Sequence, residues 1–317
     1  MEIDALHARR DARRRLIRRR RMAAGMIVAA AAAVIAIVVI ASESGGSPRA
    51  AVPVAHAGPA ARHAGPPPST SAAAHTGPPG TQPVPILMYH VIAAPPPGAP
   101  FPGLYVEPAE FAEQMQALKS AGWHAVTLDQ VQAYWRRGVP LGAGKPIVIS
   151  FDNGYNSQYT QALPVLRRLG WVGDENLQLT GLPPSQGGLG PEQIRGLLTA
   201  GWELDTQGIS HADLITLDAE ELHQQVALAR QTLQQRYHVP VNWFCYPSGH
   251  YDPTVVAAVK AAGFSGSTTV VPGWAHPGDD PYRLHRLRVL GGTSASALLE
   301  LLDDTREAPP APASYSA

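Results

Sequence analysis

The segment Lys145-Pro-Ile-Val-Ile-Ser-Phe-Asp-Asn-Gly-Tyr155 decides how this chain folds. Its β-branched and aromatic residues form a short apolar run that is typical of a buried strand. The run ends in Asp152, Asn153 and Gly154, which are polar or turn-forming residues. The segment therefore predicts a core strand that delivers polar side chains to the end of a sheet.

The same pattern recurs along the chain from Pro83 onward. Six further runs of strand length lie at residues 85–89, 125–128, 202–205, 243–246, 266–271 and 287–290. Amphipathic stretches with helical spacing lie at residues 108–121, 128–137, 157–169, 191–200, 219–237, 253–262 and 295–302. Because strands that alternate with helices favour a parallel sheet, we expect an α/β fold, an irregular barrel of about seven parallel strands.

Polar groups also follow three of the other predicted strands. His90 ends the first strand, His211 follows the strand at 202–205, and the segment 242–249 closes with a proline and a glycine. In barrels of this kind, functional side chains gather where strands end and loops begin. We therefore expect one site, formed by several strand ends at the same end of the barrel.

The amino-terminal segment is typical of a membrane anchor. Residues 1–21 contain nine arginines and three acidic residues, and residues 22–41 contain no charge. Twenty helical residues span about 30 Å, the thickness of the hydrocarbon core. The arginines predict a cytoplasmic amino terminus, a single-pass transmembrane signal anchor at 22–41 and an extracytoplasmic domain held at the cell membrane. A cleaved signal peptide, which would leave a secreted protein, is the alternative.

Composition separates a linker and a tail from one folded domain. Residues 42–83 are rich in alanine, proline and glycine and bury too little apolar surface to fold, so we expect a disordered linker. Residues 306–317 are expected to form a disordered tail, which leaves 84–305 as the domain. After residue 21 the chain holds 16 bases and 22 acids, so nucleic acid is not an expected partner. The single cysteine, Cys245, excludes a disulfide framework and a cysteine-rich metal site.

These segments, in this order, resemble the polysaccharide deacetylase family (the NodB homology domain), in particular its exported branch that begins with a Leu-Met-Tyr-His strand. The likeness extends over residues 84–290 in four motif blocks. It implies an irregular barrel and the removal of N- or O-acetyl groups from cell-wall glycans or exopolysaccharides. It also implies a divalent metal, usually zinc, held by one aspartate and two histidines beside a catalytic aspartate.

The motif positions of the metal site are only partly retained. The family's Asp-Asp pair falls on Asp152 and Asn153, and its paired histidines fall on Gln207 and His211. The resemblance implies that Asp152 holds the base position and that His211 is the retained ligand. Asn153 and Gln207 are then degenerate ligand positions, because zinc sites use thiolate, imidazole or carboxylate ligands. Harder ions such as calcium and magnesium accept amide oxygens, and we expect zinc to be held weakly.

Two functions remain open at this stage. The first is a membrane-anchored deacetylase, a hydrolase of carbon–nitrogen bonds other than peptide bonds, acting on N-acetylated glycans. The second is a catalytically impaired relative that binds cell-envelope glycan or scaffolds partners. In both, the motif positions of His90, Tyr246 and Pro247 imply that these residues line the substrate groove.

Overall fold

The computed structural model describes residues 77–180, 182 and 187–316, which belong to one compact unit. The predicted cytoplasmic segment, the predicted anchor at 22–41 and most of the predicted linker lie outside these residues. Within the described residues, no helix combines the length and apolar character that a bilayer span requires.

A parallel sheet forms the centre of the domain. Its strands are β1 (Ile86–Tyr89), β2 (Trp123–Ala125), β3 (Lys145–Asn153), β4 (Asp174–Leu177), β5 (Glu203–Thr206), β6 (Trp243–Cys245), β7 (Gly266–Thr268) and β8 (Leu287–Arg288). Seven strands follow the order β7-β6-β5-β4-β3-β1-β8, and β2 pairs with β3 outside this path. The residues before β8 pair with β7 through a parallel bridge between Thr268 and Leu284. The sheet therefore curves back toward its first edge, which confirms the predicted barrel-like α/β architecture.

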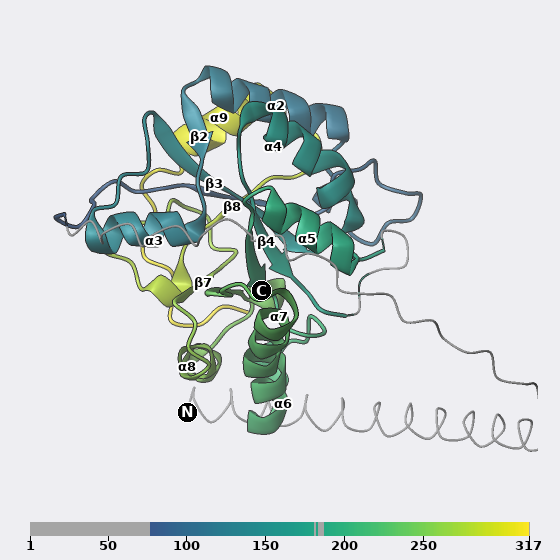
Figure 1. Ribbon diagram of the computed structural model, residues 1–317, viewed down its shortest axis with the longest axis vertical. Coiled ribbons are helices and arrows are strands. Elements are labelled where there is room, and N and C mark those ends of the chain that lie inside the picture. Colours follow the sequence, from purple (N-terminus) through teal and green to yellow (C-terminus); the bar gives the residue numbers. More distant parts are fainter. Residues whose placement is uncertain (1–76, 181, 183–186, 317) are drawn as a thin grey trace, which may run out of the picture. The chain divides into compact units, whose positions relative to one another are not determined.

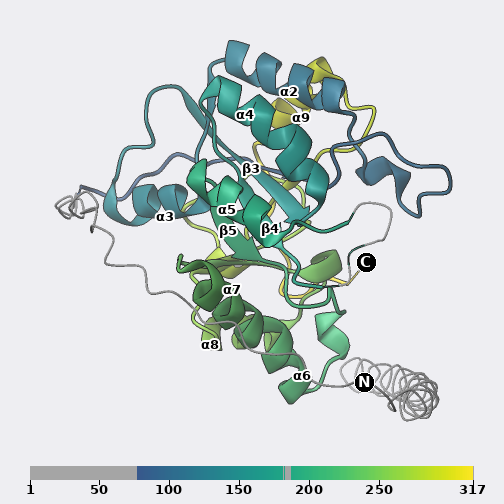
Figure 2. The same ribbon diagram turned by 45° about the vertical axis from the view of Figure 1, so that its right-hand side comes forward.

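Helices cover the outside of this sheet. They are α2 (Pro108–Ser120), α3 (Leu128–Arg137), α4 (Leu163–Leu169), α5 (Pro191–Thr199), α6 (Ala219–His223), α7 (Ala229–Tyr237), α8 (Pro253–Ala261) and α9 (Ala295–Asp304). Figures 1 and 2 show α2, α4 and α9 at one end of the domain and α6, α7 and α8 at the other. The first group packs on β1 and β3 around Leu87, Ile149 and Phe151, and the second packs on β5 and β6 around Leu204 and Phe244.

One central strand is absent from the sequence-based expectation. β4 (Asp174–Leu177) lies between β3 and β5 and is buried along its whole length. Its sequence, Asp-Glu-Asn-Leu, is rich in residues that are depleted in strands. The strand forms here because both its neighbours supply a complete ladder of hydrogen bonds, in register with Ser150–Asn153 on one side and Glu203–Thr206 on the other.

Asp174 and Asn176 of β4 face the inside of the barrel. Side chains alternate along a strand, so Asp174 and Asn176 share a face with their register partners Ser150 and Asp152. The Sγ atom of Cys245 on β6 donates to Asp152 across this interior at 3.6 Å, although β6 and β3 are not neighbours in the sheet. Part of the barrel core is therefore built from polar groups.

Two segments outside the barrel attach to its surface. Before β1, the backbone N–H groups of Gly77 and Gly80 donate to carbonyls at the end of α3. Beyond α9, Tyr315 forms two backbone hydrogen bonds with Tyr251, and their rings stack at 6.5 Å. The residues 306–316, which the composition predicts to be a disordered tail, thus contact the domain in the structure.

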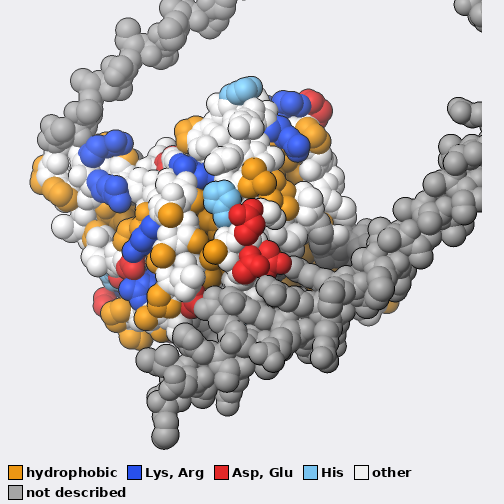
Figure 3. Space-filling view, turned by 90° about the horizontal axis from the view of Figure 1, so that it is seen from below, with side chains coloured by type: hydrophobic (Ala, Val, Ile, Leu, Met, Phe, Trp, Pro, Cys, Tyr) orange, Lys and Arg blue, Asp and Glu red, His pale blue; other side chains and the backbone are white. Residues whose placement is uncertain are grey.

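One face of the molecule shows how charge is distributed. On the face seen in Figure 3, lysine and arginine side chains stand in separate small groups, and acidic side chains gather beside a histidine. No single basic patch extends over the part of this face that belongs to the described residues.

Candidate functional site

The site is built around Asp152, the next-to-last residue of β3. Its carboxylate forms a bidentate pair with Arg286: the Nη1 atom donates to Oδ1 at 2.7 Å and the Nη2 atom donates to Oδ2 at 2.9 Å. Arg286 precedes β8 and is 1% exposed, and Asp152 is equally buried. The Nε atom of Arg286 donates to the carbonyl of Thr269, which fixes the plane of the guanidinium.

This pair determines the charge state of Asp152. Burial by itself raises the pKa of a carboxyl group, but the charge and hydrogen bonds of Arg286 outweigh burial and lower the pKa of Asp152 to about 2. Asp152 is therefore a carboxylate near neutral pH. A carboxylate of such low pKa is a weak proton acceptor near neutral pH.

Three more side chains contact Asp152. Asn176 Nδ2 donates to its Oδ1 at 2.9 Å, and Cys245 donates to its Oδ2. His90, at the end of β1, has its Nε2 atom 3.9 Å from Oδ2. Burial lowers the pKa of His90 to about 4 despite the nearby Asp152, so the imidazole is neutral at neutral pH. The structure thus brings His90 and Asp152 together as two polar ends of adjacent strands.

The two amides at the degenerate ligand positions bind each other. Asn153 Nδ2 donates to Gln207 Oε1 at 2.9 Å and to Gln178 Oε1 at 3.3 Å. Asn153 has a φ of 77°, a left-handed conformation that asparagine tolerates better than most residues. The three amides lie at the ends of β3, β4 and β5, so one cross-strand network spans the mouth of the barrel.

This network does not fit the family's metal. A cation needs lone pairs directed at it, whereas Asn153 presents an N–H to the oxygen of Gln207. The amides are neutral, and His211 is the one imidazole among the three positions. The donor set at Asn153, Gln207 and His211 is therefore unsuited to zinc.

Two histidines, His211 and His250, lie on loops beyond the strand ends and are close enough for their charges to interact. His211 has a φ of 52°, and burial lowers its pKa, with Asp152 and His250 among the charges that act on it. The Nδ1 atom of His250 lies 3.1 Å from Asp213 Oδ1. A histidine oriented by a carboxylate is the arrangement that proton transfer requires, so His250 is a candidate proton donor that the motif comparison did not reveal.

The expected groove residues are largely enclosed. Tyr246 is 1% exposed, its hydroxyl donates to the carbonyl of Tyr282, and its ring stacks on Tyr251 at 4.9 Å. Pro247 is buried at the start of a short 3-10 turn, Pro247–Gly249. The structure places both residues behind the mouth, where they support the loop that carries His250.

Sequence reasoning missed Arg286 and Asn176. Arg286 lies in the segment Leu284-His285-Arg286-Leu287, where a charged residue interrupts apolar positions. That interruption was a usable signal, because a charge next to a predicted buried strand needs a partner if it is itself buried. Asn176 belongs to β4, which the sequence did not predict to be a strand because its residues are polar.

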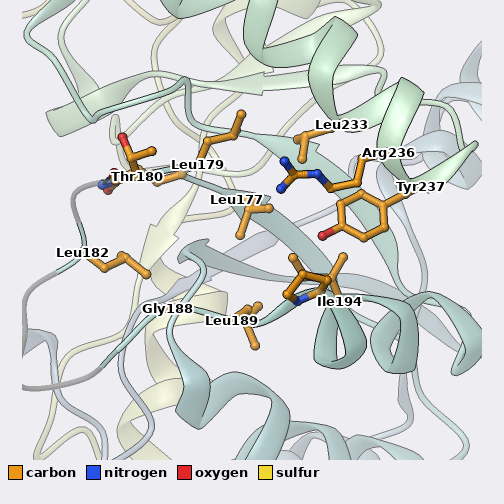
Figure 4. Close-up of a pocket in the computed structure, with 12 residues that line it drawn as sticks. Leu177, Leu179, Thr180, Leu182, Gly188, Leu189, Ile194, Leu233, Arg236 and Tyr237 are labelled. Carbon is orange, nitrogen blue, oxygen red and sulfur yellow. Dashed lines mark hydrogen bonds between the residues drawn. The ribbon is translucent and has the colours of Figure 1, made fainter. Parts of the chain in front are cut away.

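A cavity of about 310 Å³ lies next to the amide network. It is bounded by the end of β4, α5 and α7, and Figure 4 shows Leu177, Ile194, Leu233 and Tyr237 around it with Arg236. Gln178 belongs both to this lining and to the amide network. Its described lining combines apolar side chains with the polar groups of Gln178, Thr180, Arg236 and Tyr237, so the cavity is of mixed character.

Comparisons with known proteins agree with the geometry. Residues 142–267 match the family model for polysaccharide deacetylase. The putative polysaccharide deacetylase YxkH of Bacillus subtilis is 28% identical over 228 residues, which cover 72% of this chain and 78% of that protein. The poly-beta-1,6-N-acetyl-D-glucosamine N-deacetylase of Escherichia coli is 35% identical over 66 residues, 21% of this chain and 10% of that protein.

A solved structure supports the same assignment. A putative polysaccharide deacetylase from Bacillus anthracis superposes with a TM-score of 0.62 at 26% identity, covering 70% of this chain and 69% of that chain. The chain therefore carries a polysaccharide deacetylase domain, which confirms the family predicted from the motifs.

Proposed function

We propose that this protein, with its polysaccharide deacetylase domain, binds an N-acetylated glycan of the cell envelope at the mouth of the barrel, without metal-dependent hydrolysis of the acetyl group. The observation that carries the proposal is the hydrogen bond between Asn153 and Gln207, which fills two metal-ligand positions with paired amides. Amide groups donate and accept hydrogen bonds, as an acetamido group does. The arginines of residues 1–21 and the apolar residues 22–41 support an anchored, extracytoplasmic location.

The chemistry around Asp152 supports binding over hydrolysis. Attack of water on an amide carbonyl needs an activated water and a polarised carbonyl, and the low pKa of Asp152 makes it a poor base for this purpose. Arg286 occupies both oxygens of the carboxylate. In this arrangement Asp152 neutralises the buried guanidinium of Arg286 and fixes the strand ends at the mouth of the barrel.

Acetyl hydrolysis is the second candidate function. It is favoured by the retained Asp152 and His211 and by the pair of His250 with Asp213, in which His250 would be the proton donor to a leaving amine. The named activity of the E. coli relative, removal of N-acetyl groups from poly-N-acetylglucosamine, supports the same substrate class.

One experiment distinguishes the two functions. The full-length protein is incubated with N-acetylglucosamine oligomers, with and without added zinc or cobalt, and both oligomer binding and acetate release are measured. We expect saturable binding without acetate. Metal-stimulated acetate release that disappears in Asp152→Asn would overturn the proposal, and the absence of both binding and acetate release would also contradict it. A His223→Gln variant, altered on α6 away from the mouth, serves as the control.

A further inference from the structure

A second group of acidic residues lies inside the barrel, away from the amide network. Asp174 begins β4, and Glu203 and Asp205 belong to β5. One carboxylate oxygen from each lies within 4.8 Å of the others. Asp174 and Asp205 are fully buried, whereas Glu203 is partly exposed. We call these three residues the carboxylate cluster.

Each carboxylate uses one oxygen to anchor backbone. Asp174 Oδ2 accepts from the N–H of Leu128 and Glu203 Oε2 accepts from the N–H of Asp129, both in the first turn of α3. Asp205 Oδ1 accepts from the N–H groups at the start of β6. These contacts give a hydrogen-bond partner to one oxygen of each carboxylate and attach α3 to the sheet. They do not account for the second oxygen of each carboxylate.

The second oxygens accept no hydrogen bond of good geometry among the residues that the structure describes, although the side chains of Thr127 and Asp205 interact with Glu203. These oxygens are Asp174 Oδ1, Glu203 Oε1 and Asp205 Oδ2, and all three atoms are buried. Three carboxylates so close together repel one another strongly in a medium of low dielectric constant. The charged groups that act on these three residues are all acidic, in contrast to Asp152 with its Arg286. A bound cation, or protons on the carboxylates themselves, must therefore balance their charge.

A neutral side-chain oxygen bears on the choice between a cation and protons. Asn176 lies between Asp152 on β3 and Asp205 on β5 in the register of the sheet. Its Nδ2 atom donates to Asp152 at 2.9 Å, and its Oδ1 atom is buried without a partner among the described residues. Because Nδ2 is turned to Asp152, Oδ1 is turned away from it, and Asp205 is the register partner of Asn176 on the other side. An unpartnered carbonyl oxygen beside three carboxylates suits a cation with a preference for oxygen.

We propose that Asp174, Glu203 and Asp205, together with the side-chain oxygen of Asn176, form a buried calcium site inside the barrel. Calcium takes six to eight oxygen ligands at about 2.3–2.6 Å, so opposite ligands stand about 4.8 Å apart. One oxygen from each carboxylate lies within 4.8 Å of the others, close enough for the three residues to share one ion. Zinc prefers nitrogen and sulfur ligands in tetrahedral sites, and magnesium demands a near-ideal octahedron, whereas calcium accepts mono- and bidentate carboxylates in a flexible geometry.

The site stabilises the fold in this proposal. It joins β4, β5 and the first turn of α3, which are separated in sequence but share the cluster. Without an ion, burial and mutual repulsion raise the pKa of Asp174 and Asp205, and protons must neutralise the cluster instead. A proton-filled cluster is therefore the competing state, and it does not depend on the glycan-binding proposal.

The test uses the full-length protein after dialysis against a chelator. Calcium, manganese and magnesium chlorides are titrated separately, with binding followed by calorimetry and stability by thermal unfolding. We expect one equivalent of calcium to bind and to raise Tm by about 5 °C at a hundredfold excess over Kd. Asp205→Asn keeps the shape of the side chain and should weaken calcium binding by at least about tenfold, since ligand charge sets the affinity of such sites.

Two controls keep the outcome interpretable. His211→Gln alters the mouth and should bind calcium as the unmodified chain does, so loss of binding in this variant alone would place the ion at the mouth and overturn the proposal. If Asp205→Asn fails to fold, the same measurements are made on Glu203→Gln, because position 203 is partly exposed. Absence of stoichiometric calcium binding by the unmodified chain, with an increased Tm of the ion-free Asp205→Asn, would show that the cluster holds protons.

Discussion

Arg286 binds both carboxylate oxygens of Asp152 from a position 134 residues farther along the chain. The pair is enclosed by the barrel, and further contacts to Ser150 and Cys245 use the remaining donors of the guanidinium. A buried pair of this kind contributes little net stability relative to apolar residues, but either partner alone is costly. The pair therefore positions the strand ends that carry Asn153 and His90.

Replacement of Arg286 should destabilise the protein strongly. Arg286→Met leaves a buried, unpaired carboxylate at Asp152, and we expect the free energy of unfolding to fall by about 3–5 kcal/mol. The measurement is urea unfolding at neutral pH. Arg195→Met, which removes an exposed arginine paired with Glu192, is the matched control and should cost less than about 1 kcal/mol. A loss of similar size in both variants would refute a buried pair.

His90 should make stability depend on pH in a defined window. The unfolded chain protonates this histidine below about pH 6.5, whereas the folded protein does so only below about pH 4. The unfolded state therefore binds more protons between these values, and stability falls as pH decreases from 6.5 to 4.

The variant His90→Gln should lose up to about 3 kcal/mol of this pH dependence. The quantity to compare is the difference in unfolding free energy between variant and unmodified chain at pH 7 and at pH 4, because that difference cancels the other titrating groups. A pH-independent difference would show that His90 is not buried in its neutral form.

Restoring the family's ligands should create a zinc site. Asn153→Asp with Gln207→His replaces the hydrogen-bonded amides by a carboxylate and an imidazole beside His211, and aspartate tolerates the left-handed backbone at position 153. We expect zinc affinity to increase by more than about 100-fold. Mutating residues that only hold a metal ligand in place changes affinity by up to about 100-fold, and here two ligands themselves are restored. Calorimetry with zinc chloride measures it. Unchanged zinc affinity would mean that the mouth geometry, and not the donor set, prevents metal binding.

Gly154 should tolerate no larger residue. It has a φ of 83°, and a Cβ atom there would lie 2.3 Å from Leu177 Cδ1. Gly170 has a φ of 71°, and a Cβ atom there would lie more than 4 Å from every described residue outside its own neighbours. Alanine at 170 would therefore have the same unfavourable backbone conformation as alanine at 154 but no steric clash. We expect Gly154→Ala to cost more than Gly170→Ala, which should lose about 1 kcal/mol. Equal losses in thermal unfolding would show that Leu177 moves aside freely.

The sequence was most informative where apolar periodicity dominates. The strand that ends in Asp152, the seven helical stretches and the motif positions at 207 and 211 could all be assigned from the residues alone. β4 could not, because Asp174, Glu175 and Asn176 contradict strand propensity and are tolerated only by the ladders on both sides. Arg286 was also missed, because no local pattern indicates which distant carboxylate it will meet.

The long separation between Asp152 and Arg286 has a consequence for synthesis of the protein. On the ribosome, Asp152 on β3 is synthesised well before Arg286, which pairs with it. A partly synthesised barrel that excluded water at that stage would bury an unpaired carboxylate, which is costly. The interior must therefore stay hydrated until the segment before β8 arrives. We expect the helix-covered outer layers to assemble first, with dehydration of the interior as the final step of maturation.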